Sequence, residues 1–500
     1  MTRSGDRTER LLARPLSVLQ TCARCSGLRA GPTFAVAVVS SSKALIFLFA
    51  VFVTATAAAL AAPAGERAPP AAGIVLPEQL FPTLDRILAS ALQQSPQAIR
   101  ASVDVLMAEQ MEDVARARLL PYVGGGGTYS AAQERRLDRP GSFPAEKLTY
   151  NFGLTQPLYH WGALRDGLRV AQIASLIADR NQAEAMRVLV LDLRQVFLRL
   201  VVEKAGLKRI QTMVQLAEED LRAMESRIAS GAAPNAELLG AQLRLEDARL
   251  ELERGAEAMR FNRAALERLA GIPPLAPEDI PDVIPPLPPV PGGPGALLAR
   301  FEGDRDAGGD FRLGALNLQL EQERLNYRII NVNLRPKFNI VTGAMQDEVS
   351  YTGSPADRAR IQSFYAGINL NWTLFDGHAT RAQRKVSLLR TRQLEGERET
   401  RRAEVVERAR NQARLLEIAQ RQIAVSEGRL GQLDGLVRFQ EEEVARGNLS
   451  RREAASVALS RDDILVRTFA NRVEYLSRLA EFLSVIGRDP LLARIPESRP

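Results

Sequence analysis

The chain has 500 residues, of which 46% are hydrophobic and 25% are charged, and this globular composition excludes a wholly disordered or collagen-like protein. Two cysteines and two histidines exclude a disulfide framework and argue against a cofactor-rich enzyme. The net charge is +7, but residues 1–61 contain seven basic and only two acidic groups. The remaining 59 basic and 57 acidic groups nearly balance, so no general basic surface for nucleic acid is expected.

The first feature along the chain is an apolar run from Ala44 to Leu60, which follows Lys43 and ends at small-residue sites of the A-x-A type. These are the parts of a secretory signal. An uncleaved membrane anchor is the alternative, because a run of about 17 residues is marginal for a membrane span. Cys22 and Cys25 lie upstream of the run, and this C-x-x-C has no second pair that would complete a zinc site.

The exported part of the chain contains an internal repeat at an offset of about 216 residues. The matching landmarks are Gly231 and Gly447, Gly271 and Gly487, and Leu158-Tyr159 and Leu374-Phe375. Each copy is predicted to run helix, strand, loop, strand, long helix, turn, long helix. The segment between the copies is rich in proline, which blocks helix formation, so an extended linker is expected there.

These observations divide the chain into six parts. They are a leader with the signal peptide (1–61), an N-terminal segment (62–83) that the resemblance described below implies is periplasmic, the first repeat (84–271), a Pro-rich linker (272–296), the second repeat (297–488) and a C-terminal tail (489–500).

The strands of both copies alternate between apolar residues and small, uncharged polar residues. One face of the predicted strands carries Leu148, Tyr150, Phe152 and Leu154, and Phe364, Ala366, Ile368, Leu370, Trp372 and Leu374. The opposite face carries Asn151, Thr155, Asn369 and Asn371. This pattern is typical of a membrane barrel wall with lipid outside and water inside. A half-buried sheet in a soluble protein has the same period and is the alternative. Partner strands are expected over Tyr122–Ala132 and Lys337–Gln346.

The long helices carry heptads. In the first copy, apolar residues recur at alternating steps of four and three from Leu189 to Ile228, with Glu203 as the one polar member. The equivalent positions from Val405 to Val444 keep the pattern with three polar members. A period of 3.5 residues predicts coiled-coil packing. No proline interrupts Ala163 to about Ser230, so this helix would form a rod of roughly 100 Å and each copy a long antiparallel hairpin.

Four strands cannot close a barrel, and an open sheet in a bilayer would leave unpaired edges. If the strands span a membrane, the chain must therefore form an oligomer. A trimer would supply twelve strands, although closure alone does not choose between two, three and four copies.

In the order, duplication and spacing of these helices, strands and turns, the chain resembles the TolC-like outer membrane efflux proteins of Gram-negative bacteria. The resemblance covers residues 84–271 and 297–488. The features that carry the resemblance are Ala115-Arg116 with Pro121 before the first strand, Gln156-Pro157-Leu158-Tyr159 after the second, Leu374-Phe375-Asp376-Gly377, and the glycines of the helical turns. The resemblance implies a mainly α-helical fold with a small β part, assembled into a trimeric 12-stranded β-barrel that is continued by a helical periplasmic tunnel. It implies passive export from an inner-membrane pump and a periplasmic adaptor protein through the cell outer membrane.

The resemblance also implies functional residues at the turns between the long helices. The adaptor-contact tips match Ser230, Gly231, Ala232, Arg446, Gly447 and Asn448, and the periplasmic entrance of the tunnel matches Glu237 and Glu453. An acidic residue in the first turn of a helix is also favoured by the helix dipole, which is an equally good explanation of both glutamates. Positions that hold some members of the family closed correspond here to Val444 and Leu449, so that contact is not carried over. Under this interpretation Tyr150, Phe152, Leu154, Ile368, Leu370 and Trp372 face lipid, and Asn151, Thr155, Asn369 and Asn371 face the lumen.

Other functional classes receive less support from the sequence. No Ser/His/Asp set indicates an enzyme, and no cofactor is expected. His160 and His378 stand at equivalent strand ends without further metal ligands nearby, which favours turn histidines over a metal site. An exported coiled-coil scaffold or adhesin-like protein without a channel would explain the heptads but not the duplicated alternating strands.

Overall fold

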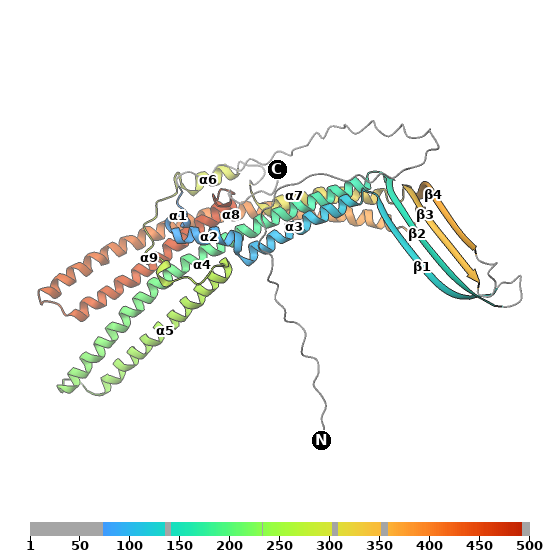
Figure 1. The fold of residues 1–500 in the computed structure, drawn as a ribbon. Coiled ribbons are helices and arrows are strands. Elements are labelled where there is room, and N and C mark those ends of the chain that lie inside the picture. The colour runs from blue at the N-terminus through green and yellow to red at the C-terminus, as the bar shows by residue number, and fades with distance from the viewer. Residues whose placement is uncertain (1–73, 136–141, 233, 303–308, 352–358, 493–500) are drawn as a thin grey trace, which may run out of the picture. The chain divides into compact units, whose positions relative to one another are not determined.

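The computed structural model describes residues 74–135, 142–232, 234–302, 309–351 and 359–492, all within one compact unit, Ala61–Pro500. The predicted leader, both cysteines and most of the predicted C-terminal tail lie outside the described residues. The chain is mainly helical and carries one antiparallel sheet (Figure 1). Within the described part, no helix is both long and apolar enough to cross a membrane.

Three helices precede the sheet: α1 (Pro77–Leu80), α2 (Pro82–Gln94) and α3 (Pro96–Ala117). Each has proline at its first position, where the missing N–H has no helical partner to lose and the fixed φ angle already suits a helix. Ser95 ends α2 and starts α3, because its hydroxyl accepts a hydrogen bond from the Ala98 N–H at 3.0 Å.

The two long helices have equal lengths. Helix α4 (Ala163–Ala229) and helix α8 (Ala379–Ala445) each contain 67 residues, and their first and last residues are 216 positions apart. The returning helices α5 (Ala236–Ala270) and α9 (Arg451–Val485) each contain 35 residues. Every residue of the two predicted heptad seams is buried or half-buried, because α4 packs along α5 and α8 along α9.

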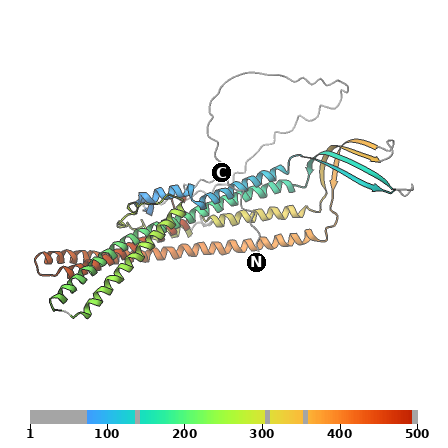
Figure 2. The ribbon, with the colours of Figure 1, turned by 60° about the horizontal axis from the view of Figure 1, so that its bottom comes forward.

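The long helices lie side by side with their neighbours in a consistent order. Next to the sheet, α4 packs between α3 and α7 (Phe311–Asn331), and α7 packs against α8. Toward the hairpin turns, α4 lies between α5 and α9, and α9 lies against α8. Helices α3 and α5 therefore form one edge of the layer and α8 forms the other, as Figure 2 allows the reader to follow.

The Pro-rich segment packs more closely than a free linker would. Ile280 and Ile284 are fully buried against the helical core, and Lys204 donates to the Ile280 carbonyl at 2.6 Å. The segment contains a short 3-10 turn, η1 (Pro277–Asp279), and helix α6 (Gly293–Glu302) starts before the predicted end of the linker at residue 296. The prolines prevent a regular helix here, but the apolar residues between them still pack into the core formed by the helices.

The sheet has the order β1-β2-β3-β4 and is antiparallel throughout. The strands are β1 (Tyr122–Glu134), β2 (Phe143–Tyr159), β3 (Lys337–Tyr351) and β4 (Ala359–Asn371). Strand β4 ends one residue before Trp372, so the prediction of Trp372 as a strand residue is wrong. Asn371 pairs with Lys337, and the preceding Pro336 has no N–H with which to continue the ladder.

Candidate functional site

The strand register separates the predicted sheet residues into two groups on opposite faces. Phe152 pairs with Ala344, and Ala344 with Phe364, so even-numbered residues of β2, β3 and β4 share one face. This face carries Tyr150, Phe152, Leu154, Ile368 and Leu370. The other face carries Asn151, Thr155, Asn369 and Asn371. All nine are exposed or half-buried, so neither face is covered by the rest of the chain.

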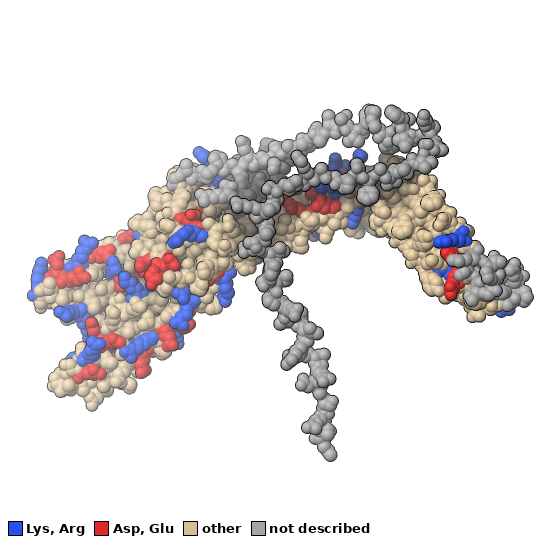
Figure 3. All heavy atoms as spheres, viewed as in Figure 1, with Lys and Arg blue, Asp and Glu red and all other residues tan. Residues whose placement is uncertain are grey.

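Charged groups on the sheet gather at its loop end. On the even-numbered face, Arg360 lies 3.5 Å from Glu348. On the odd-numbered face, Lys147 lies 3.6 Å from Asp347, which also accepts a hydrogen bond from Thr149 at 3.0 Å. Figure 3 shows the visible face of the sheet largely without charge between this end and the helices, whereas the hairpins carry many charged side chains.

Both hairpin turns are built on a glycine with positive φ. Gly231 has φ 73° and Gly447 has φ 80°, a conformation that glycine adopts without steric cost. After α4, the Ala232 N–H donates to the Arg227 carbonyl at 2.8 Å, and after α8 the Asn448 N–H donates to the Glu443 carbonyl at 2.9 Å. These bonds satisfy carbonyls that a helix end leaves free. The six predicted tip residues, Ser230, Gly231, Ala232, Arg446, Gly447 and Asn448, are all exposed in these two turns.

The two glutamates predicted at the entrance have different surroundings. Both are exposed and lie in the first turn of a returning helix, Glu237 in α5 and Glu453 in α9. The Glu453 carboxylate accepts hydrogen bonds from the Ser450 hydroxyl at 2.8 Å and the Ser450 N–H at 3.2 Å, and these bonds hold its pKa below the ordinary value. Glu453 therefore caps its helix, whereas Glu237 has no such partner at Asn235, which makes no side-chain cap.

Two ion pairs connect the first hairpin to the second. Arg452 of α9 lies 2.7 Å from Asp220 of α4, and Arg209 of α4 lies 3.1 Å from Asp463 of α9. The sequence analysis did not identify these four residues. No local pattern could have done so, because each pair joins helices that are more than 200 residues apart in the chain.

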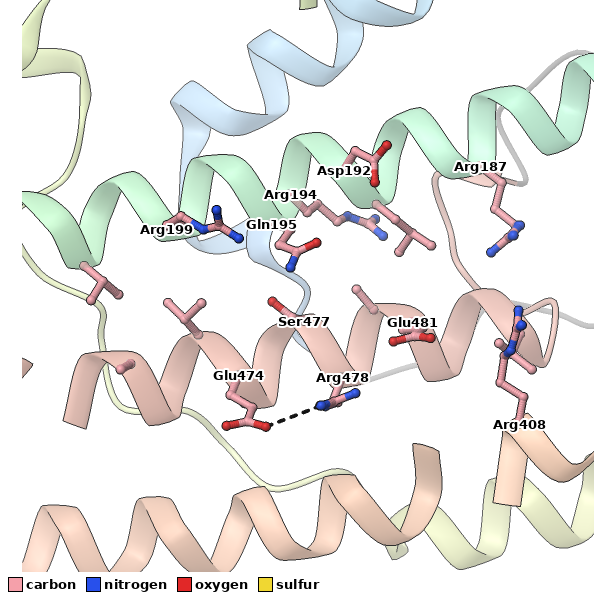
Figure 4. A pocket seen from close by; sticks show the side chains of 16 residues that line it. Arg187, Asp192, Arg194, Gln195, Arg199, Arg408, Glu474, Ser477, Arg478 and Glu481 are labelled. Carbon is pink, nitrogen blue, oxygen red and sulfur yellow. Dashed lines mark ion pairs between the residues drawn. The ribbon is translucent and has the colours of Figure 1, made fainter. Parts of the chain in front are cut away.

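A polar cavity of about 670 Å³ lies between α4 and α9 (Figure 4). Its charged lining residues are partly neutralised: Arg478 pairs with Glu474 of the same lining at 3.5 Å, and Arg187 pairs with Glu184, which lies outside the lining, at 2.7 Å. Burial raises the pKa of Asp192 on the same wall. The lining contains Ser477 but neither histidine nor cysteine.

Neither histidine takes part in a metal site within the described ranges. The His160 ring nitrogen Nε2 lies 2.9 Å from Asn339 Oδ1, and the His378 ring lies edge-on to Phe375 with the centroids 5.3 Å apart. No group of three or more His, Cys, Asp or Glu side chains in this part of the chain could hold a metal ion.

Among the helices, the exposed large apolar side chains are concentrated on those at the two edges of the layer. Helices α3, α5 and α8 carry them, α4 carries only Leu176, and α7 and α9 carry none among their described residues. The exposed residues are Ile99, Val103, Leu106, Met107, Met111 and Val114 on α3; Leu239, Leu243, Leu250 and Phe261 on α5; and Val386, Leu388, Leu389, Ile418, Val425, Leu436 and Phe439 on α8.

The edge stripes of α5 and α8 also differ in charge. On α5, Glu246, Glu253 and Glu257 stand between the exposed apolar residues at heptad spacing. On α8, Arg421 and Arg429 stand between Ile418, Val425 and Leu436 in the same way. Glu257 pairs with Arg260 of the same helix at 2.7 Å, so the acidic character of the α5 stripe rests on Glu246 and Glu253, whereas the α8 stripe carries the two arginines.

Comparison with known proteins gives one family and one fold. Residues 87–272 match the model of the outer membrane efflux protein family. No curated protein matches the chain. Among solved structures, the chain is similar to the outer membrane channel CmeC of Campylobacter jejuni, with a TM-score of 0.64, 14% identity and coverage of 81% of this chain and 86% of that one.

Two further channels have the same fold. The outer membrane protein VceC of Vibrio cholerae has a TM-score of 0.57 and 16% identity, and 82% of this chain covers 97% of that one. The open state of the MtrE outer membrane channel of Neisseria gonorrhoeae has a TM-score of 0.59 and 15% identity, with coverage of 82% and 90%. The family description agrees with the outer-membrane location expected from the sequence, and the similar structures establish the fold.

Proposed function

Because the chain carries an outer membrane efflux protein domain and has the fold of outer membrane channels, we propose that it is the outer-membrane channel of a tripartite efflux or type I secretion system. In this proposal it conducts solutes or proteins passively from a periplasmic adaptor and an inner-membrane pump to the exterior, and it has no enzymatic activity. The two halves act as structural repeats, which the offset of 216 residues between α4 and α8 supports.

The observation that carries the proposal is the four-stranded sheet with both faces uncovered and two unpaired edges, β1 and β4. Edge strands of 13 residues present free N–H and C=O groups, which a bilayer does not tolerate. Pairing β1 of one copy with β4 of the next removes both edges. A head-to-tail contact of this kind closes into a ring, and three copies give the twelve strands of the proposed barrel.

The helices support the same head-to-tail assembly. The edge formed by α3 and α5 lies on the β1 side of the chain and the edge formed by α8 on the β4 side, since α3 leads into β1 and β4 leads into α8. The acidic stripe of α5 in one copy would therefore meet the basic stripe of α8 in the next. The apolar residues of both stripes would be buried in the contact, and a second heptad seam would complete the wall of a helical tunnel.

The proposed trimer is tested by measuring the mass of the detergent-extracted protein by light scattering. We expect about three times the mass of the mature chain, and a monomer would overturn the barrel. Replacing Glu246 and Glu253 by Arg should weaken the trimer, as should replacing Arg421 and Arg429 by Glu. Combining both sets should restore it, because the charges again oppose each other across the contact. No recovery in the combined variant would contradict the α5–α8 pairing.

Conduction separates the channel from the alternative of an exported coiled-coil scaffold or adhesin-like protein. The purified protein should insert into planar bilayers and conduct ions, whereas a scaffold would not.

The proposed contact between the hairpin tips and the adaptor is tested by Gly447→Pro. This variant should preserve the trimer but abolish adaptor-dependent export. The φ of 80° at this turn is closed to proline, and the Gly447 N–H that donates to the Val444 carbonyl at 3.1 Å would be lost. Export at the unaltered level would contradict a role of the tips in adaptor contact.

A further inference from the structure

A row of glycines crosses the sheet at a single level. Gly124 of β1 pairs with Gly153 of β2, and Gly153 pairs with Gly343 of β3. The fourth member of the row, on β4, is Tyr365, which pairs with Gly343. The row lies on the face that carries Asn151, which is the lumen side of the proposed barrel. Glycine inside a strand weakens it and often marks a place where another group approaches the backbone closely.

The group that approaches this row is the side chain of Tyr365. A β-carbon added at Gly343 would lie 2.7 Å from the Tyr365 hydroxyl oxygen and 2.9 Å from its Cζ, and a β-carbon at Gly153 would lie 3.3 Å from the same oxygen. The ring therefore extends along the row, over β3 and as far as β2, instead of standing upright from the sheet. A tyrosine in this position covers strand backbone that has no side chain of its own.

A second tyrosine lies over the same row but does not cross it. Tyr122 pairs with Thr155 on this face, and a β-carbon at Gly124 would lie 2.9 Å from the Tyr122 ring. Tyr122 thus covers a glycine of its own strand, and it is 72% exposed, against 44% for Tyr365. Tyr365 is the tyrosine whose position depends on glycines of the neighbouring strands.

The neighbouring rows on this face carry no charge. The row on the loop side consists of Gly126, Asn151, Met345 and Ser363, and the row on the helix side consists of Tyr122, Thr155, Val341 and Gly367. Pore width, hydrogen-bonding groups and electrostatic barriers decide what a lumen passes. Because no charge stands at this level, width is the property through which the large ring of Tyr365 would act.

We infer that Tyr365 determines the size of solute that the proposed barrel passes, and that the glycine row holds its ring against the wall of the lumen. The inference rests on the proposed channel function and adds a residue that sets the width of the channel. Three copies would place three such rings at one level. A ring that lies on glycines leaves the lumen wide, whereas larger residues beneath it would raise the ring into the path of the solute.

The size limit of single channels in planar bilayers tests this inference. Polyethylene glycols of increasing size are added on the side of the strand loops, and the limit is the smallest polymer that no longer lowers the conductance. Tyr365→Ala should shift the limit to a larger polymer, whereas Tyr365→Phe, which keeps the ring, should leave the limit unchanged. An unchanged limit in Tyr365→Ala would overturn the inference.

Alanine beneath the ring should have the opposite effect. Gly343→Ala should shift the limit to a smaller polymer, because its β-carbon displaces the phenol. Gly367→Ala is the matched control: it adds the same methyl group to the same face, two residues from Tyr365, where no atom lies within 4 Å. The double variant Gly343→Ala with Tyr365→Ala should have the limit of Tyr365→Ala alone. Equal narrowing in Gly367→Ala, or narrowing that persists in the double variant, would show that the ring is not responsible.

Trimer yield is measured for every variant, because a β-carbon at Gly343 would also meet the Phe152 carbonyl oxygen. If Gly343→Ala lowers the yield, Gly153→Ala takes its place, since the nearest backbone atom there is the Thr342 oxygen at 3.8 Å, and the limit should shift in the same direction by less. Parent channels that conduct, with a limit that Tyr365→Ala leaves unchanged, contradict only this inference. A parent protein that does not conduct contradicts the proposed channel itself.

Discussion

Arg194 in the middle of α4 donates to both carboxylate oxygens of Asp489, 295 residues later, at 2.5 and 3.1 Å. The same guanidinium donates to both oxygens of Glu78, at 2.6 and 3.0 Å. Arg194 is 1% exposed, so its charge is compensated entirely inside the protein. This cluster ties the first described helix and the last described segment to α4, one of the two 67-residue helices.

Arg194→Met should destabilise the fold strongly, because it leaves two buried carboxylates without their cation. Removing one partner of a buried ion pair costs about 3–5 kcal/mol. The measurement is the urea midpoint of unfolding of the detergent-purified protein. Arg478→Met is the control on the same cavity wall: its pair with Glu474 is half-exposed, and we expect a loss below about 1 kcal/mol. Equal losses of stability in both variants would show that the buried cluster contributes no more to folding than the half-exposed pair of Arg478 and Glu474.

Glu203→Leu should stabilise the protein at neutral pH. Glu203 is the polar member of the first heptad seam; Asn262 donates to its Oε1 at 2.6 Å, but its Oε2 is buried without a partner. An unsatisfied buried polar atom costs about 1–3 kcal/mol, and leucine restores the seam. Thermal unfolding should show the gain, and Glu225→Leu on the exposed side of α4 should not.

The gain from Glu203→Leu should depend on pH in a defined direction. Burial raises the pKa of Glu203, so the folded chain favours the protonated acid. The stability from this group is present below the unfolded pKa and is lost as pH rises through the higher folded pKa. The difference between variant and parent should therefore be largest at neutral pH and shrink in acid. A difference that grows in acid would contradict a burial penalty at this site.

Arginine substitutions should distinguish the two faces of the sheet. Phe152→Arg or Ile368→Arg places a charge on the face that we expect to meet lipid and should cost about 2–4 kcal/mol near the bilayer midplane. Asn151→Arg and Asn369→Arg should fold and alter the single-channel conductance. Trimer yield after extraction and conductance in planar bilayers are the measurements. Loss of the trimer in the asparagine variants, with normal yield of the other two, would mean that the faces are inverted.

The double variant Glu237→Ala with Glu453→Ala should weaken cation preference in single-channel recordings without preventing trimer formation. Six carboxylates around a narrow entrance would attract cations. Because its hydrogen bonds hold the pKa of Glu453 below the ordinary value, Glu237→Ala alone should keep cation preference in mildly acidic buffer. Adding Ser450→Ala to Glu237→Ala removes the hydroxyl's hydrogen bond and leaves that of the backbone N–H, and this variant should lose the preference at a higher pH than Glu237→Ala alone. Full cation preference in the double variant would exclude these carboxylates from the entrance.

The sequence by itself determined the helical hairpins, because their signals are local. Heptads locate α4 and α8, and Gly231 and Gly447 mark the turns, since few other residues accept their positive φ. The alternation of the strands likewise separated Phe152 from Asn151, as the register confirms.

Only the tertiary structure decided the features that depend on partners distant in the chain. Strand β4 stops before Trp372 because its partner strand begins after Pro336. Glu453 caps its own helix while Glu237 does not, although both occupy equivalent positions. Arg194 meets Glu78 and Asp489 because helix packing brings the two ends of the described chain to the centre of α4. Such contacts follow from packing and strand register, which local patterns do not contain.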